Sequence, residues 1–460
     1  MRHKSTYWIV GLMLFALFFG AANLIYPALL GIYSGKNLWQ SILGFIITGV
    51  TLPLLGVVAV AYSGKNDIES ITQPASKAYA RFFAIALYLS IGPFFAIPRT
   101  GATSYSVGIA PIFGNGLAIK IIYGLFFFGL SYILAIRPSK IADRIGKYLT
   151  PTLLIILAIL IVASFVSPAG HLGQAVNASA SVSDSFHDLP FVAGLIQGYG
   201  TMDALAALAF AILVIESAKG YGAKTPKAIA QLTLKSGIIA AVLLAAIYIF
   251  IARIGATSQS LFTFANGAFQ LNGKPIDGGN VLSQSAAYYM GTIGQAILAM
   301  AIFLACLTTS TGLITACAEY FHKIFPKLSH VTWATLFTLI ATVFYFGGLS
   351  EIIKWSIPVL YLLYPLTMVI IVLVFLKPFI AESPLVYKTT IAFTAIPALY
   401  DAMSTLAGQT QLFTIPQSIS HFFTNVVPLG SYNMGYISFA LLGFIISFIL
   451  YKLLPQKVYE

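Results

Sequence analysis

Two long apolar segments of the chain each contain a short run of small and polar residues near their centre. The first run reads Gly20-Ala21-Ala22-Asn23, and the second reads Ile196-Gln197-Gly198-Tyr199-Gly200-Thr201-Met202-Asp203. Glycine and asparagine are poor helix formers, so we expect a helix to be interrupted at both places. An interrupted helix leaves backbone N–H and C=O groups without partners, and a bilayer tolerates such groups only where protein or a water-filled cavity satisfies them. Both runs are therefore candidate binding sites.

Two further groups could do chemistry. Residues 308–311 read Thr-Thr-Ser-Thr within an otherwise apolar segment. Adjacent hydroxyls, together with carbonyls freed at a helix break, can form a neutral oxygen cage for a hard monovalent cation. Arg99 and Asp203 are charges at expected membrane depth, where a charge is costly and is usually paired or functional. We expect Arg99 to pair with Asp203 or to lie nearer the outer surface. As an alternative role, Asp203 could carry a coupling proton.

The composition indicates that membrane-spanning helices position these residues. Of 460 residues, 59% are hydrophobic and only 8% are charged, whereas roughly 25% are charged in soluble domains. A spanning helix needs about 20 apolar residues, and the segments without any charged residue are long enough for one or two: 5–35, 37–64, 148–183, 278–318 and 402–451. The chain is expected to be an all-α polytopic membrane protein. This composition excludes soluble enzymes, disordered proteins and disulfide-rich domains. Nucleic-acid binding is excluded because the net charge of +12 forms no separable basic face.

The positions of charged residues, proline and glycine predict twelve transmembrane helices. Eleven or thirteen also fit, because these residues mark the helix ends poorly in segment 388–430. The basic residues favour the segments that are cytoplasmic if the N-terminus is cytoplasmic, including Lys140, Arg144 and Lys457. That bias predicts both termini on the cytoplasmic side of the cell membrane. The expected spans are 7–33, 38–62, 79–109, 117–136, 148–167, 190–216, 228–252, 283–318, 331–347, 355–376, 388–406 and 432–452.

The two runs occupy the first and the sixth of these spans, so they are five spans apart. An odd offset inverts one half of the chain relative to the other across the membrane. Paired breaks in inverted halves are the sequence pointer to the binding site of a secondary transporter. Ordinary helix packing is the competing explanation, because Gly194 and Gly198 also form a small-xxx-small motif. The matching positions of both runs and their polar residues favour binding.

Three stretches resemble a known family. LFALFFGAANLIYPALLG (14–31), IGPFFAIPRT (91–100) and GYGTMDALAALAFAI (198–212) look like the branched-chain amino acid–cation symporters of the BrnQ type. The resemblance covers essentially the whole chain. It implies the LeuT-like fold of the APC superfamily: a 5+5 inverted repeat with discontinuous helices 1 and 6, plus two additional C-terminal helices. The implied units are residues 1–167, residues 168–376 and residues 377–460.

The resemblance implies import of leucine, isoleucine and valine with sodium as the co-transported ion and no cofactor. Amides near Gly20 to Asn23 would bind the substrate carboxylate, carbonyls of Ile196 to Gly200 would bind its ammonium, and Tyr199 and Leu313 would be walls of an apolar pocket. One methylene is worth only about 0.8 kcal/mol, so overlapping specificity is expected. The complete set of expected substrate-binding residues is Gly20, Ala21, Ala22, Asn23, Arg99, Thr100, Ile196, Gln197, Gly198, Tyr199, Gly200, Thr201, Asp203 and Leu313.

The sodium site implied by the same resemblance uses the hydroxyls of Thr308 and Thr309 and the carbonyls of Ala16, Phe19 and Ala305. We expect one sodium ion per substrate. Hydroxyls that bond only to their own helix would be the alternative. The rival functions are a proton-coupled transporter of the same fold, a channel and, least favoured, an intramembrane enzyme, since no nucleophile–base pair, HExxH motif or P-loop is present. The expected partners are the small-molecule substrate and the lipid bilayer, and the oligomeric state stays open.

Overall fold

Helices cover every segment for which the sequence predicts a span. The structure is a computed structural model that describes residues 2–137, 145–179 and 182–453. Lys140, Arg144 and Lys457, which the topology prediction uses, lie outside the described residues. Within the described residues, eight helical stretches could cross a membrane by length and apolar composition, or nine if the bent pair Pro190–Thr201 and Asp203–Gly220 is one span. The expected twelve crossings therefore stay a prediction.

The first half of the chain contains several helices that are broken or that contain a π-helical turn; the label η marks 3₁₀- and π-helical turns. The first expected span is split into α1 (Arg2–Phe18) and α2 (Ala21–Ser34), and the third contains a non-helical residue, Gly92. The other elements up to Val166 are η1 (Gly35–Asn37), α3 (Leu38–Ile46), η2 (Ile47–Thr51), α4 (Leu52–Ser63), α5 (Ile68–Thr72), α6 (Lys77–Leu89), η3 (Ser90–Phe94), α7 (Ala96–Thr103), η4 (Ser104–Ile109), α8 (Ala110–Phe113), α9 (Leu117–Ala135), η6 (Ile145–Leu149) and α11 (Thr150–Val166).

The second half begins with a second broken helix and a small sheet. These elements are η7 (Val182–Asp184), α12 (Pro190–Gln197), η8 (Gly198–Thr201), α13 (Asp203–Gly220), α14 (Pro226–Ala256), η9 (Gln259–Leu261), β1 (Thr263–Ala265), β2 (Ala268–Leu271) and β3 (Lys274–Pro275). The three strands form an antiparallel sheet in the order β1-β2-β3, with Phe264 opposite Phe269.

The longest helix, α15 (Gly278–Ile324), carries both cysteines. It is kinked at Met290 and Gly291, where the backbone leaves the helical region. Cys306 and Cys317 are buried free thiols on this helix. The elements that follow are α16 (His330–Tyr345), α17 (Leu349–Phe375), α18 (Lys377–Ile380), α19 (Pro384–Thr410), α20 (Gln417–His421), η10 (Phe422–Val426), η11 (Gly430–Tyr432) and α21 (Gly435–Leu453).

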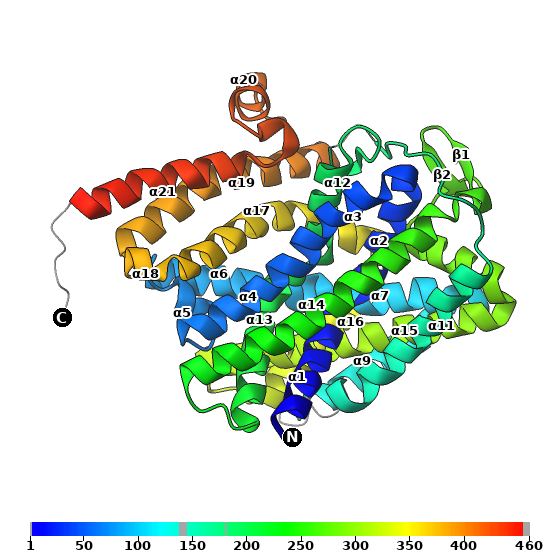
Figure 1. Cartoon of the computed structure of the whole chain (residues 1–460), viewed down its shortest axis with the longest axis horizontal. Helices are drawn as coiled ribbons and strands as arrows, with labels where there is room; N and C mark the ends of the chain where they lie inside the picture. Colours follow the sequence, from blue (N-terminus) through cyan, green and yellow to red (C-terminus); the bar gives the residue numbers. More distant parts are fainter. Residues whose placement is uncertain (1, 138–144, 180–181, 454–460) are drawn as a thin grey trace.

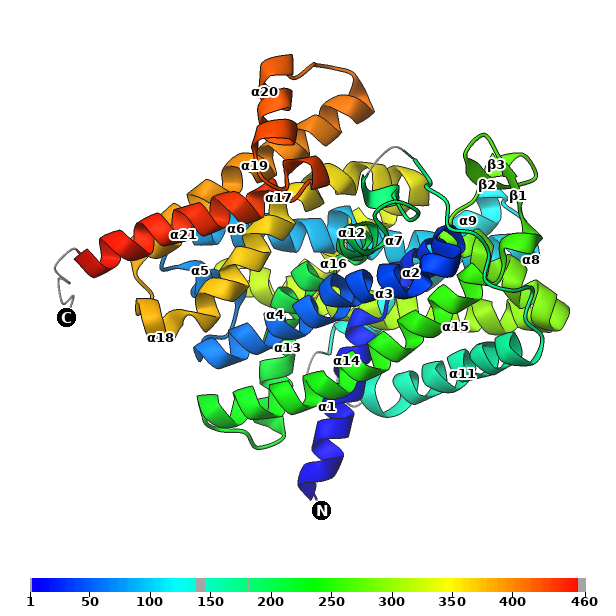
Figure 2. The ribbon, with the colours of Figure 1, turned by 45° about the horizontal axis from the view of Figure 1, so that its top comes forward.

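The helices are arranged around α13, whose residues are almost all buried. In Figure 1, α19 and α21 run beside each other along one edge of the bundle, away from α1 and α14. Figure 2 shows α1 leaving the bundle toward the N-terminus, at a steep angle to the neighbouring helices. The core therefore places α1, α2, α7, α13 and α15 around a common centre, and α19 and α21 lie outside it.

The described parts of the loop 168–189, residues 168–179 and 182–189, cover one end of the bundle. The Lys36 N–H donates to the Gly173 carbonyl at 2.9 Å, and the Val176 N–H donates to the Tyr33 carbonyl at 2.9 Å. Gln197 at the end of α12 donates to the Asp184 carboxylate at 3.1 Å. These bonds tie the loop both to the end of α2 and to the start of the second break, so the loop is a fixed cover over that end.

Candidate functional site

The first break lies at Phe19 and Gly20, between α1 and α2. Gly20 is extended, with φ −110° and ψ −161°, and the Asn23 Oδ1 accepts a hydrogen bond from the Gly20 N–H at 3.1 Å. Pro27 lies inside α2, after the break. Since α2 begins only at Ala21, the carbonyl with which Pro27 would clash belongs to Asn23 in the first turn, where it can tilt outward.

The second break is a tight turn. Residues Gly198–Thr201 form one turn of 3₁₀ helix, and Met202 then adopts a left-handed conformation with φ 65°. The two helices on either side of this break are bent by 42°. The helix is therefore interrupted where the sequence predicts it, and the interruption takes the form of a 3₁₀ turn. Asp203 is the first residue of α13, so its carboxylate lies at the positive end of that helix.

Asn23 joins the two breaks. Its side-chain amide donates to the Asp203 carboxylate and to the Tyr248 hydroxyl, and Tyr248 in turn donates to the same carboxylate oxygen at 3.4 Å. All three side chains are buried. Tyr248 lies on α14 and has no sequence signal, since it is one of 25 tyrosines in the chain. The first break is thus linked to the second by side chains rather than by backbone contacts.

Arg99 is buried and bonds to the backbone of the second break. Its two terminal nitrogens donate to the Gly200 carbonyl at 2.9 Å and to the Thr201 carbonyl at 3.1 Å, and the residue is 4% exposed. Among the described residues Arg99 forms no direct ion pair with Asp203, so the first sequence alternative is wrong. The second, a position nearer the outer surface of the membrane, stays a prediction for this buried side chain. The bend after Gly200 turns the carbonyls, rather than the carboxylate, toward the guanidinium. Thr100 instead bonds back to the Ile97 carbonyl of its own helix at 2.6 Å.

A cavity of about 20 Å³ lies between the two breaks. Its lining includes predicted residues from both breaks, from α7 and from α15, and it adds apolar residues that the sequence did not single out. A space of this size holds little more than one water molecule, so it is too small for an amino acid. The predicted residues that line it are Gly20, Ala22, Asn23, Arg99, Thr100, Thr201, Asp203, Thr309 and Leu313, and the additional ones are Leu17, Phe18, Ala96, Met202 and Ala206.

The side chain of the predicted residue Ala21 lies outside the described part of the structure. Five of the other predicted substrate residues lie outside this lining. Tyr199 is not a wall of the cavity, because its ring stacks on Tyr364 with centroids 4.7 Å apart and its hydroxyl contacts Tyr436 at 2.7 Å. The turn at the second break directs this side chain toward α17 and α21. Gly198 and Gly200 are packing positions: a Cβ there would lie 2.0 Å from the Thr48 Oγ1 or 2.2 Å from the Tyr26 ring, respectively. The other two residues are Ile196, which is buried, and Gln197, which bonds to the loop 168–189.

The two threonines of the candidate cation site contact the end of α1. Thr308 Oγ1 donates to the carbonyls of Ala16 and Ala305, both at 2.9 Å, and Thr309 Oγ1 lies 3.0 Å from the Leu17 carbonyl and 3.4 Å from that of Ala16. Hydroxyls and carbonyls from two helices thus converge. We expected Phe19 to contribute a carbonyl, but the contact is made by Leu17, because α1 stays helical up to Phe18.

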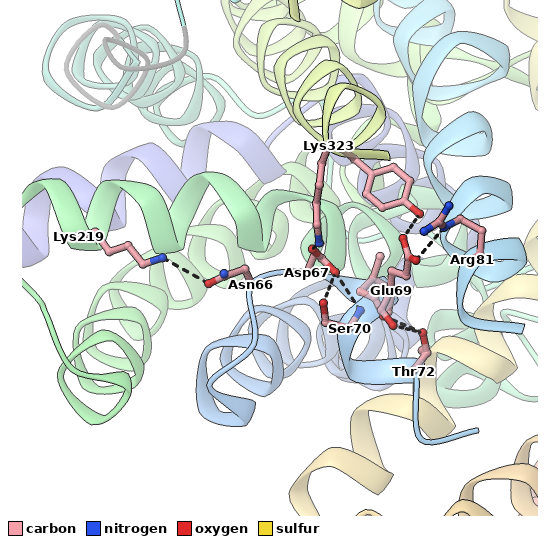
Figure 3. Close-up of polar contacts among 10 residues, drawn as sticks. Asn66, Asp67, Glu69, Ser70, Thr72, Arg81, Lys219 and Lys323 are labelled. Atoms are coloured by element: carbon pink, nitrogen blue, oxygen red, sulfur yellow. Dashed lines mark hydrogen bonds and ion pairs between the residues drawn. The ribbon is translucent and has the colours of Figure 1, made fainter. Parts of the chain in front are cut away.

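A second polar cluster lies at the ends of α13 and α15 (Figure 3). Asp67 caps α5 by accepting from the Ser70 N–H at 2.9 Å and forms an ion pair with Lys323 at the end of α15. Glu69 accepts from Arg81 at 2.7 Å and from Tyr320 at 2.7 Å. These contacts fasten the connection between α4 and α6 to the end of α15.

A cavity of about 260 Å³ adjoins this cluster. It shares two walls, α13 and α15, with the small cavity between the breaks. Between the two cavities the helices are packed: a Cβ at Gly312 would lie 2.2 Å from Leu17, and the rings of Phe18 and Phe210 have centroids 6.0 Å apart. The lining of the larger cavity is Asn66, Asp67, Ile212, Ile215, Glu216, Lys219, Glu319, His322 and Lys323.

Comparison with known proteins decides the family. The family model described as "Branched-chain amino acid transport protein" matches residues 3–454. The chain belongs to this family. It is 40% identical to the branched-chain amino acid permease BraB of Bacillus subtilis, over 96% of this chain and 94% of that protein. It is 38% identical to the branched-chain amino acid permease BrnQ of Lactobacillus delbrueckii subsp. lactis, over 95% of each. The protein is therefore a membrane transporter of the branched-chain amino acid permease family and not an enzyme.

Solved structures show the same fold at low sequence identity. A nucleobase-cation-symport-1 family transporter in a closed conformation, with bromovinylhydantoin bound, has a TM-score of 0.61 at 13% identity and covers 97% of this chain and 92% of its own. A manganese transporter mutant from Eremococcus coleocola has a TM-score of 0.57 at 14% identity, with coverages of 96% and 95%. These similarities concern the fold alone, and they agree with the expected LeuT-like transporter architecture.

Proposed function

We propose that the protein is a sodium-coupled symporter that imports leucine, isoleucine and valine by alternating access. The relatives named above are branched-chain amino acid permeases, and they support the substrate class. The apolar part of the cavity lining, which includes Leu17, Phe18, Ala206 and Leu313, suits an aliphatic side chain. Because a single methylene changes binding by only about 0.8 kcal/mol, the three substrates should compete with one another.

One observation carries the coupling to sodium. Thr309 lines the small cavity and also contacts the carbonyl of Leu17, another residue that lines it. Together with Thr308 and the carbonyls of Ala16 and Ala305 it supplies an uncharged oxygen set, which suits a hard monovalent cation. A cation bound there would hold the end of α1 against α15 and so fix one wall of the substrate cavity. Substrate and sodium would then each favour the geometry that the other needs.

The substrate needs more space than the described cavity offers. The first-turn amides of α2, at Ala21 and Ala22, would face the carboxylate at the positive end of the helix. We propose that α1, α2, α12, α13 and α14 move against α7 and α15 to enlarge the cavity, and that the larger cavity beside Asp67 leads toward the cytoplasm. The units 1–167 and 168–376 would be the two inverted repeats, with 377–460 outside them and both termini cytoplasmic in the cell membrane.

Radiolabelled leucine uptake into proteoliposomes tests the proposal. An inward sodium gradient should drive leucine accumulation above equilibrium. In a competition panel of the twenty amino acids, isoleucine and valine should inhibit leucine uptake, and amino acids with side chains of other shapes should not. The double variant T308A/T309A should lose sodium dependence while still reaching the membrane. Unaltered sodium activation in that variant would discredit the oxygen site.

A proton-coupled transporter of the same fold is the second candidate. The buried Asp203, which accepts from Asn23 and Tyr248, is the observation that favours it, since a buried carboxylate can exchange a proton during a transport cycle. Uptake driven by an inward proton gradient without sodium, and abolished in D203N, would support this candidate. Uptake indifferent to a proton gradient but dependent on sodium would reject it.

A further inference from the structure

Two opposite charges line the same small cavity without pairing with each other. Arg99 and Asp203 are 4% and 3% exposed, and both belong to its lining. Arg99 comes from α7, and Asp203 comes from the start of α13. Each charge has dipolar partners: Arg99 contacts backbone carbonyls, and Asp203 contacts an amide and a phenol. A buried charge is costly when no opposite charge meets it directly, so this arrangement calls for a ligand.

Arg99 has hydrogen-bond donors to spare. A guanidinium carries five N–H groups, and its recorded hydrogen bonds use one on each terminal nitrogen, toward Gly200 and Thr201. The remaining donors belong to a planar fork whose geometry matches a carboxylate. Because the guanidinium is part of the cavity lining, a carboxylate in an enlarged cavity could reach that fork without displacing the two carbonyls.

Asp203 likewise has acceptor capacity to spare. The hydrogen bonds from Asn23 and Tyr248 both end on Oδ2, and the Thr201 side chain also interacts with the carboxylate. A carboxylate has about four lone-pair sites, so it can still accept from a further donor. An ammonium group is the natural partner, since it carries three N–H donors and a full positive charge. The Gly200 carbonyl, which the sequence prediction gave to the ammonium, already accepts from Arg99.

We propose that Arg99 binds the carboxylate and Asp203 binds the ammonium of the amino-acid substrate. The inference rests on the proposed function, and it names the residues that recognise the zwitterion. Through Arg99 the substrate is linked to the carbonyls of the second break, and through Asp203 and Asn23 it is linked to the Gly20 amide of the first break. A molecule that lacks either charged group therefore leaves one buried charge of the protein unmet.

Equilibrium binding to purified full-length protein in detergent tests this assignment, because it does not require transport. Radiolabelled leucine is displaced by unlabelled leucine, by 4-methylpentanoate, which lacks the ammonium, and by 3-methylbutylamine, which lacks the carboxylate. D203N should weaken leucine about 10- to 100-fold, as expected for the loss of a charged hydrogen bond, and should leave 4-methylpentanoate unchanged or stronger. R99Q should weaken leucine and 4-methylpentanoate by similar factors and leave 3-methylbutylamine unchanged.

Matched variants separate this effect from a general loss of structure. D401N removes a buried carboxylate on α19, outside the cavity lining, and R253Q removes an arginine that stacks on Phe165 on the opposite side of α14. Both should bind leucine like the wild type. D203E keeps the charge but displaces it by one methylene. It should still weaken leucine more than 4-methylpentanoate, which keeps the assignment testable if D203N does not yield a monodisperse protein.

Three outcomes would overturn different statements. If wild-type protein binds leucine but the Asp203 variants weaken leucine and 4-methylpentanoate by the same factor, the carboxylate does not read the ammonium and the inference fails alone. If wild-type protein shows no saturable leucine binding, the proposed substrate class fails together with it. Equal loss of all three ligands in R99Q would likewise assign Arg99 to holding the second break rather than to the carboxylate.

Discussion

Adding one methyl group at Gly20 should impair sodium binding more than leucine recognition. A Cβ at this position would lie 2.9 Å from Thr309 Oγ1, 3.1 Å from its Cγ2 and 3.2 Å from its Cβ. The backbone of Gly20 is extended, so alanine meets no conformational penalty there. The cost arises instead from Thr309, a β-branched side chain that has little freedom to turn aside. G20A should therefore push the Thr309 hydroxyl away from the carbonyls of Leu17 and Ala16.

The expected size follows from the bonds that are lost. Thr309 Oγ1 lies 3.0 and 3.4 Å from those carbonyls, and its single hydrogen supports about one hydrogen bond, worth about 0.5–1.5 kcal/mol. The loss corresponds to roughly a 2- to 13-fold higher sodium concentration at half-maximal uptake. Leucine uptake in proteoliposomes, measured across a sodium series, gives that concentration directly.

A double-mutant cycle makes the explanation refutable. T309A removes the atoms that the new methyl group would strike first, so G20A should add little further cost in the T309A background. If the two substitutions raise the half-maximal sodium concentration by independent, additive amounts, the effect of G20A does not pass through Thr309. An unchanged sodium dependence in G20A itself would refute the proposed ion site at this contact.

Three further predictions concern stability. D67A should remove both the cap of α5 and the partner of Lys323, costing about 1–2 kcal/mol and lowering the Tm in detergent by roughly 2–4 °C; an unchanged Tm would contradict the structural role of this pair. Burial holds the pKa of Asp184 above its ordinary value. The folded protein therefore binds a proton at Asp184 more tightly than the unfolded chain and loses stability as the pH rises through that pKa. D184N should flatten this part of the Tm–pH curve, and an unchanged curve would show that Asp184 does not cause the pH dependence. G194A should sharply reduce the yield of monodisperse protein, because its Cβ would lie 1.9 Å from a backbone oxygen of α3; G129A, which meets nothing within 4 Å, is the matched control and should express normally.

The sequence predicts best what depends on local chemistry. Gly20 and Asn23 identify the first break because a glycine and a side chain that can cap the backbone act on their own neighbours. Thr308 and Thr309 identify the candidate cation site because they are adjacent hydroxyls on an otherwise apolar helix. Their carbonyl partners on α1 differ from the expected ones at one position, since the contact with Leu17 rather than Phe19 depends on how far α1 stays helical.

Directions of side chains could not be read from the sequence. The two glycines beside Tyr199 are compatible with a ring that lines the cavity and with a ring that points away from it. The turn of the second break directs the ring toward Tyr364. Tyr248 contributes to the site from α14 through tertiary packing alone. The same holds for Arg99, whose carbonyl partners become accessible only because the backbone bends after Gly200.

The positions of the two cysteines have a practical consequence for watching this molecule move. Cys306 and Cys317 are both fully buried, and the Sγ of Cys317 contacts the Tyr88 carbonyl at 3.4 Å. A bulky maleimide in the surrounding solution should therefore react with neither thiol while the bundle is folded. Single cysteines placed in the wall of the larger cavity, for example at Ile215, can then report by their labelling rates when that cavity opens, against a silent native background.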